Sequence, residues 1–95
     1  MFGLVGKMRA APGKRSDLIA ILSGGTQAMS GCISYVVSED ASDADAIWIH
    51  EVWDSEESHR ASLQLPEVKA AIAKGRPLIA GFDFSAKTRP VAGVR

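Results

Sequence analysis

The chain is poor in cysteine, has no excess of either charge and contains no long apolar run. Cys32 is the only cysteine among 95 residues, which excludes an internal disulfide and a cysteine-based zinc knuckle. Lys and Arg together number 11, as do Asp and Glu, so the charge balance gives no support for a nucleic-acid or anionic-membrane surface. No segment approaches the roughly 20 apolar residues of a membrane helix. The apolar start at residues 1–7 is too short for a secretory signal, so we expect a cytoplasmic protein.

The composition is that of one folded domain. Hydrophobic residues make up 46% of the chain, which argues against disorder. A chain of 95 residues leaves no room for a second core. We therefore expect a single domain over residues 1–95, with residues 89–95 as a loose tail.

Hydrophobic periodicity predicts the elements of the first half. Residues 2–9 alternate and predict a strand, and residues 11–14 carry a turn signal. A helix is expected next, capped by Ser16 or Asp17, with its apolar face made by Leu18, Ile21 and Leu22 and extended by Ala28 and Met29. The glycines at 24 and 25 favour a bend or an end within it, and Gly31 is the expected stop. Residues 32–38 predict a second strand whose core side carries Ile33, Tyr35 and Val37.

The second half predicts a hairpin, a divided helix and a last strand. The polar loop 39–45 is short, which favours antiparallel pairing of the strands on either side. Residues 54–57 start a helix with carboxylates in its first turn. Pro66 divides the helical pattern, and Gly75 and Pro77 end it. In the final strand Phe82, Phe84 and Ala86 alternate with polar residues, which predicts that the three share one face.

The order strand, helix, strand, strand, helix, strand predicts a fold class. It is the split βαβ arrangement of a ferredoxin-like α+β sandwich, an antiparallel sheet with helices on one face. The other sheet face then needs cover. A second, identical subunit is the simplest cover, so we expect a homodimer.

The strand at residues 47–53 supports this view because neither of its faces is an ordinary solvated one. Alternation directs Ile47, Ile49, Glu51 and Trp53 to one side and Trp48, His50 and Val52 to the other. Each side thus carries a tryptophan and a polar group. We expect the Trp53 side to face the helices and the Trp48 side to face the partner subunit.

Three segments together resemble a known family. Residues 11–14 (Ala-Pro-Gly-Lys), 30–35 (Ser-Gly-Cys-Ile-Ser-Tyr) and 51–57 (Glu-Val-Trp-Asp-Ser-Glu-Glu) are similar in order and spacing to the antibiotic biosynthesis monooxygenase domain family, over roughly residues 4–84. The resemblance implies a dimeric α+β barrel of two ferredoxin-like subunits. It also implies an oxygen-dependent oxidation of an aromatic, quinol or polyphenolic substrate without metal or flavin, so the expected cofactor is none and dioxygen is the co-substrate.

The chain departs from the family pattern at one position. Members often have a histidine in the helix after the Glu-x-Trp step, a few residues before a Ser-Pro pair. Aligned on Trp53 and Pro66, that position is Ser62, and His59 lies one helical turn earlier. A haem ligand at the usual place is therefore missing, which disfavours haem degradation.

The candidate site residues each have a structural alternative. Trp53 suits a ring-stacking wall with an indole donor, or it fills the core beside Ile47 and Ile49. Tyr35 is expected to be buried, as core filling or as a substrate contact. Glu51 is either a buried base or one partner of an ion pair with Arg or Lys. His59 lines the cavity mouth or is solvated, and Ser62 joins it and Tyr35 as a polar cavity group.

His50 is chemically the first choice for a general base, because imidazole groups in general exchange protons near neutral pH. Its parity opposes that of Trp53, which favours an interface role instead. Cys32 has no histidine nearby in sequence and is expected to be an inert thiol. No phosphate loop, zinc spacing or dinucleotide fingerprint is present.

The sequence thus predicts catalytic roles for His59, Tyr35 and Ser62, and substrate binding by Trp53, Glu51 and Tyr35. The predicted reaction is cofactor-independent monooxygenation of a small aromatic or quinol-like compound. Two alternatives stay open: a non-catalytic dimeric protein that binds a small molecule in the same cavity, and an isomerase on the same fold.

Overall fold

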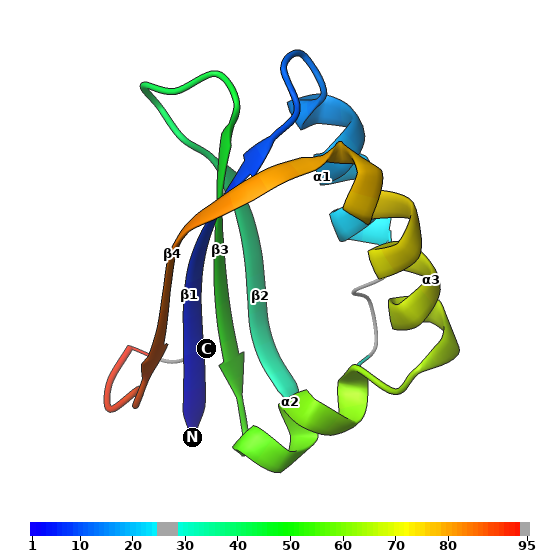
Figure 1. Ribbon diagram of the computed structural model, residues 1–95. Coiled ribbons are helices and arrows are strands. Elements are labelled where there is room, and N and C mark those ends of the chain that lie inside the picture. The colour runs from blue at the N-terminus through cyan, green and yellow to red at the C-terminus, as the bar shows by residue number, and fades with distance from the viewer. Residues whose placement is uncertain (25–28, 94–95) are drawn as a thin grey trace.

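The computed structural model describes residues 1–24 and 29–93, which form a four-stranded sheet with helices on one side (Figure 1). The elements follow one another in the order β1 Phe2–Ala10, α1 Arg15–Gly24, β2 Cys32–Glu39, β3 Ala46–Trp53, α2 Glu56–Ser62, α3 Pro66–Gly75, a 3-10 turn η1 Arg76–Leu78 and β4 Ile79–Thr88. The strands lie in the order β2-β3-β1-β4, and every neighbouring pair is antiparallel. The predicted ferredoxin-like α+β fold is confirmed.

The helix boundaries differ from expectation around α1. This helix begins at Arg15, and the Lys14 carbonyl accepts a hydrogen bond from the Leu18 amide at 3.0 Å, so Ser16 lies inside the first turn and does not cap it. The helix ends at Gly24, as the paired glycines favoured. Gly31 is therefore not its stop; with φ of 83° it turns the chain into β2. Met29 lies beyond the helix, and Ala28 falls outside the described residues.

The division of the second helical region at Pro66 is confirmed. α2 begins after Ser55, whose hydroxyl accepts a hydrogen bond from the Ser58 amide at 3.2 Å. α3 begins with Pro66 at its first position, where the missing amide hydrogen has no intrahelical partner to lose. Gly75 ends α3, and η1 leads into β4.

Three register shifts interrupt the strand pairing, and two of them change the faces predicted for particular side chains. Between β2 and β3, Cys32 lies opposite Trp53 and Ser34 opposite Val52, so Ile33 is an extra residue. The prediction that Ile33 belongs to the core is therefore wrong: its side chain is 39% exposed.

The second shift lies in β4. Phe82 pairs with Met8, whereas Phe84 pairs with the next residue of β1, Lys7, so Asp83 is the extra residue. The predicted one-sided β4 is wrong for this reason. Phe82 points to the helix side with Met8, and Phe84 lies on the opposite face with Lys7.

The core lies between α1 and the central strands. Its buried members are Met8, Ala10, Leu18, Ile47 and Ile49. Leu18 and Ile47 are fully buried, and each such side chain contributes about 1.5–3 kcal/mol through burial. Gly75 of α3 packs so closely on α1 that an added Cβ would lie 3.3 Å from Leu18 Cδ1. This core fixes one end of the helix layer on the sheet.

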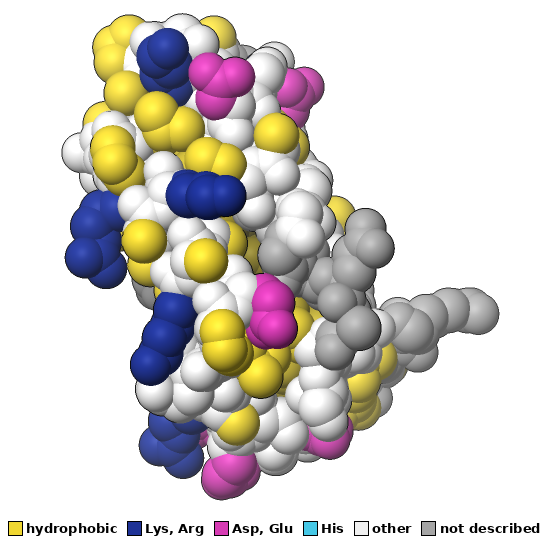
Figure 2. Space-filling view, turned by 90° about the vertical axis from the view of Figure 1, so that its right-hand side faces the viewer, with side chains coloured by type: hydrophobic (Ala, Val, Ile, Leu, Met, Phe, Trp, Pro, Cys, Tyr) yellow, Lys and Arg dark blue, Asp and Glu magenta, His cyan; other side chains and the backbone are white. Residues whose placement is uncertain are grey.

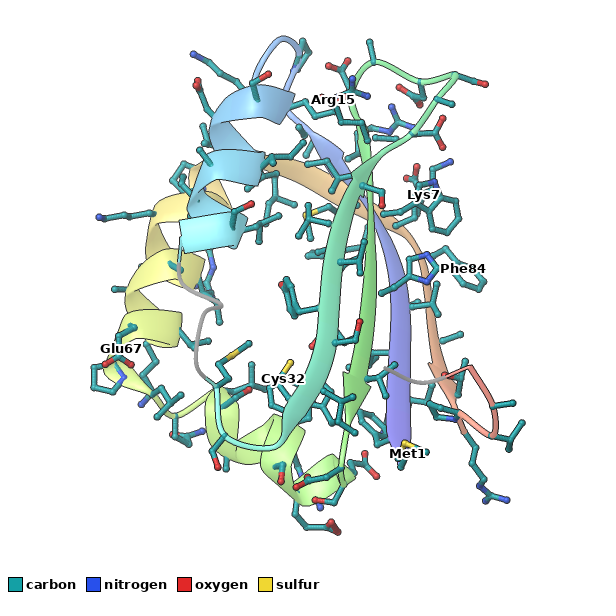
Figure 3. All side chains as sticks on the ribbon, turned by 180° about the vertical axis from the view of Figure 1, so that it is seen from behind. Met1, Lys7, Arg15, Cys32, Glu67 and Phe84 are labelled. Atoms are coloured by element: carbon teal, nitrogen blue, oxygen red, sulfur yellow. The ribbon has the colours of Figure 1, made fainter. Side chains whose placement is uncertain are left out.

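The helices cover one face of the sheet only. Figure 2 looks onto the helix layer, where hydrophobic side chains are interspersed with charges of both signs. On the opposite face, Lys7 and Phe84 point away from the helices (Figure 3). None of the helices in the described ranges is long and apolar enough to cross a bilayer.

The sheet face opposite the helices is organised around Trp48. Its indole Nε1 donates a hydrogen bond to Asp40 Oδ2 at 2.8 Å, Lys7 Nζ lies 5.3 Å from the ring centroid, and the Phe84 ring lies 6.3 Å away. The Trp48 hydrogen bond and two backbone amides lower the pKa of Asp40 to about 2. His50 is exposed on this face. The predicted division of β3 into two faces is therefore confirmed.

Candidate functional site

The end of β3 places Trp53 and Glu51 side by side under the helices. They are two residues apart on one strand and so point to the same face. Trp53 is 1% exposed, and its indole Nε1 donates a hydrogen bond to Glu51 Oε1 at 2.9 Å. This hydrogen bond between two residues of β3 holds the Glu51 carboxylate against Trp53.

His59 reaches the same cluster from α2. Its ring stands edge-on to Trp53 at 5.4 Å between centroids and lies 5.6 Å from the Phe2 ring. His59 Nε2 is 3.9 Å from Glu51 Oε1, too long for a hydrogen bond but close enough for an ion pair when the imidazole is protonated. The side chain is 19% exposed, so His59 lines the cavity and is not simply solvated. Within the described chain, Glu51 thus pairs with a histidine and not with the expected Arg or Lys.

Ser62 lies one helical turn after His59. Its hydroxyl donates to the His59 carbonyl oxygen at 2.6 Å, and the residue is 5% exposed. Because the hydroxyl hydrogen is used within the helix, Ser62 has only acceptor capacity left for a ligand. Its position in the cavity wall matches the prediction, but its geometry suits it poorly as a proton donor.

Tyr35 of β2 lies opposite Glu51 in the strand register. Burial, followed by the negative charge of Glu51, raises the pKa of the Tyr35 hydroxyl well above its usual range. The hydroxyl therefore stays protonated at neutral pH. Among the described residues it has no hydrogen-bond partner, so its hydrogen is available to an oxygen atom of a ligand. Tyr35 can serve as a donor and not as a base.

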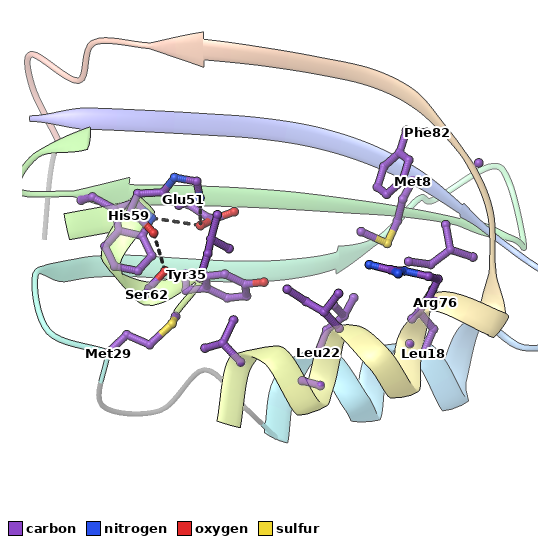
Figure 4. Close-up of a pocket in the computed structure, with 18 of the residues that line it drawn as sticks. Met8, Leu18, Leu22, Met29, Tyr35, Glu51, His59, Ser62, Arg76 and Phe82 are labelled. Carbon is purple, nitrogen blue, oxygen red and sulfur yellow. Dashed lines mark hydrogen bonds and ion pairs between the residues drawn. The ribbon is translucent and has the colours of Figure 1, made fainter. Parts of the chain in front are cut away.

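These side chains surround one end of a cavity of about 550 Å³ (Figure 4). The remaining wall is mainly apolar, and the helices as well as the sheet contribute to it. It includes Met8, Leu18, Leu22, Met29, Leu63, Val68, Ala71, Ile72, Ile79 and Phe82. A pocket of this size, apolar with a few polar groups at one end, is typical of a site for a small organic molecule.

The opposite end of the cavity was not foreseen from the sequence. Met8, Phe82 and Arg76 lie there, away from Glu51 and His59 (Figure 4). Phe82 was expected to share a face with Phe84, and the β4 bulge separates the two. Arg76 directly follows α3. A basic residue at the end of a helix is ordinarily explained by its favourable interaction with the helix dipole. No pattern along the chain distinguishes it from the other basic residues.

Cys32 and the acidic residues outside the cavity show no features of a second site. The Cys32 thiol contacts the Ser34 carbonyl oxygen at 3.6 Å, and burial with the nearby Glu51 charge raises its pKa, which keeps it a thiol. Among residues 1–24 and 29–93, no three His, Cys, Asp or Glu side chains converge in a way that would hold a metal ion.

The fold and the cavity define a class of protein: a small ferredoxin-like domain with a mainly apolar pocket between sheet and helices. The family model described as antibiotic biosynthesis monooxygenase matches residues 1–74. The chain belongs to the antibiotic biosynthesis monooxygenase family, which supports a general monooxygenase-like function. The resemblance found in the sequence is thereby confirmed.

Solved structures agree with this assignment. A candidate antibiotic biosynthesis monooxygenase from Chloroflexus aurantiacus J-10-fl is 63% identical, with a TM-score of 0.95, over 97% of this chain and 94% of that chain. A candidate member from Deinococcus radiodurans is 25% identical, with a TM-score of 0.81, over 100% of this chain and 97% of that one. One from Caulobacter crescentus CB15 is 18% identical over 96% and 90%, with a TM-score of 0.86, and shows the fold alone. No curated protein matches this chain in sequence.

Proposed function

We propose that this protein is a cofactor-independent monooxygenase that oxidises a hydroquinone or related phenolic compound with dioxygen. The observation that supports it is the cluster of His59, Glu51 and Trp53 at the end of an apolar cavity whose wall also includes Tyr35. The substrate supplies the electrons: a hydroquinone and dioxygen yield a hydroxyquinone and water. One oxygen atom enters the ring, and the other leaves with two hydrogens.

Each residue of the cluster has a role in this reaction that follows from its chemistry. His59 accepts the phenolic proton, and the Glu51 carboxylate at 3.9 Å stabilises the imidazolium that results. Tyr35 donates a hydrogen bond to a substrate oxygen, since its hydroxyl stays protonated. Trp53 forms a flat wall for the ring. The apolar lining excludes water from the phenolate as it reacts with oxygen.

Oxygen uptake by the purified protein with a panel of hydroquinones tests this function. We expect His59→Gln to lower the rate about a hundredfold, which is a typical contribution of a positioned acid–base group. His50→Gln is the matched control, because it removes the chain's other histidine from the exposed far face. Uptake that falls equally in both variants, or no uptake with any hydroquinone, would contradict the proposal. Tight binding without uptake would favour a binding protein.

We further propose that a second copy of the chain covers the open sheet face. On that face Phe84, next to the Trp48 ring, is 49% exposed, and Val36, opposite His50, is 48% exposed. Exposed apolar side chains that gather on one sheet face in this way mark a surface of interaction with another protein. Light scattering at micromolar concentration is expected to give a dimer, and Phe84→Glu is expected to give a monomer. A monomeric wild-type protein would refute this assembly.

A further inference from the structure

Arg76 is the one lysine or arginine among the described residues that line the cavity. It is the first residue of η1, directly after α3 ends at Gly75. Figure 4 shows its side chain directed into the cavity beside Met8, at the end opposite Glu51 and His59. The two ends of the cavity thus differ in charge, with an acidic group at one and a basic group at the other.

Arg76 has no partner among the described residues. Each of the arginines Arg9, Arg15 and Arg60 has a carboxylate within 4 Å, whereas Arg76 makes neither an ion pair nor a hydrogen bond there. Glu51 is the sole carboxylate in the described cavity lining, and it already binds the Trp53 indole at the far end. Arg76 is exposed, so its guanidinium is reachable by a ligand at this end of the cavity and has no competing carboxylate among the described residues.

The strand register gives the separation of the two ends. Met8, beside Arg76, pairs with Ile47 of β3, and Glu51 follows Ile47 by four residues on the same strand. At 3.3 Å per residue, the acidic and basic ends lie about 13 Å apart. A single ring cannot reach both ends, but a ring with a side chain of several carbons can.

We propose that Arg76 binds a carboxylate at the end of the substrate opposite its oxidised ring, so that the substrate class is a hydroquinone joined by a linker to an acid. This rests on the proposed function, whose cluster at His59 places the ring. A guanidinium presents parallel N–H donors that match a carboxylate.

Anaerobic binding of (2,5-dihydroxyphenyl)alkanoic acids and their methyl esters tests the inference without any oxidation step. The acetic, propanoic and pentanoic acids would be compared by quenching of tryptophan fluorescence, to which Trp53 in the cavity wall contributes. We expect the pentanoic acid to bind about tenfold more tightly than its methyl ester. The acetic acid and its methyl ester should bind with nearly equal affinity.

Variants assign the preference to one side chain. Arg76→Gln should abolish the preference for the acid, and Arg76→Lys should retain part of it. Lys74→Gln is the matched control, because it removes the same charge two residues earlier in α3 from a position outside the cavity lining. The inference is overturned if acid and ester bind equally, if no probe binds, or if both Gln variants lose the preference alike.

The outcome for Arg76 is separate from the outcome for oxidation. An Arg76-dependent preference for the acid without aerobic oxygen uptake would refute the proposed function and leave the binding inference standing. Oxygen uptake with neutral hydroquinones and no preference for the acid would refute the inference and leave the function standing.

Discussion

Gly31 directly precedes β2 and packs against the start of α2. Replacing it with alanine tests how the site is positioned. Its φ of +83° is costly for any residue with a Cβ, by about 1–2 kcal/mol. An added Cβ would also lie 2.6 Å from Ser58 Oγ, 2.7 Å from Ser58 Cβ and 2.8 Å from Asp54 Oδ1. The Ser58 amide binds the Ser55 cap of α2, so relief of this overlap must displace the helix start.

Gly13 provides the matched control. Its φ of +75° is similar, but an added Cβ would meet nothing within 4 Å. Gly13→Ala therefore isolates the backbone cost of about 1–2 kcal/mol. We expect Gly31→Ala to cost about 1–3 kcal/mol more, in line with the overpacking of a tight site.

Thermal unfolding by circular dichroism measures both effects. For a domain of this size, each kcal/mol lowers the midpoint by about 4–8 °C. Because Ser58 precedes His59, Gly31→Ala should also weaken the binding of hydroquinones, whereas Gly13→Ala should not. Equal losses at Gly31 and Gly13, or a neutral Gly31→Ala, would refute the reasoning.

Three further predictions concern the packing of the core, the stability of the fold at low pH and the titration of the single tyrosine. Leu18→Ala should lower the free energy of unfolding by about 2–5 kcal/mol in urea titrations, since Leu18 is fully buried; a loss below 1 kcal/mol would contradict the packing. Asp40 has a folded-state pKa of about 2, below its usual value of 3.8, so it stabilises the fold above pH 4 and loses this contribution as the pH falls toward 2. Urea midpoints from pH 7 to 2 should therefore depend less on pH in Asp40→Asn, and an unchanged slope would count against the Trp48 contact. Tyr35 is the only tyrosine, and its raised pKa predicts that absorbance at 295 nm starts to rise only well above pH 10; a normal titration would show that it is not buried. Stability should fall as the pH rises above 10, because the unfolded chain ionises Tyr35 first.

Local patterns predicted a large part of the fold. Alternation along β3 correctly separated Trp53 and Glu51 from Trp48 and His50, because side-chain direction in a strand follows from the backbone alone. Pro66 marked the start of α3 for a similar local reason, because proline is disfavoured inside a helix but tolerated in its first turn. These predictions needed no knowledge of any neighbour.

The errors came from pairing between strands. Strict alternation placed Ile33 in the core and put Phe82 and Phe84 on one face. A bulge in β2 and another in β4 made both predictions wrong. A bulge depends on how two strands align, so one strand read alone gives no sign of it. This is why the cavity role of Phe82 was missed.

The sequence by itself determined the element order, the ferredoxin-like fold and the two faces of β3. Only the tertiary structure brought His59 to within 3.9 Å of Glu51 and set Arg76 at the other end of the cavity. The physical reason is that periodicity fixes direction within one element, whereas a distance between elements depends on how helices pack on the sheet. That packing rests on contacts such as Gly75 against Leu18, between residues far apart in the chain.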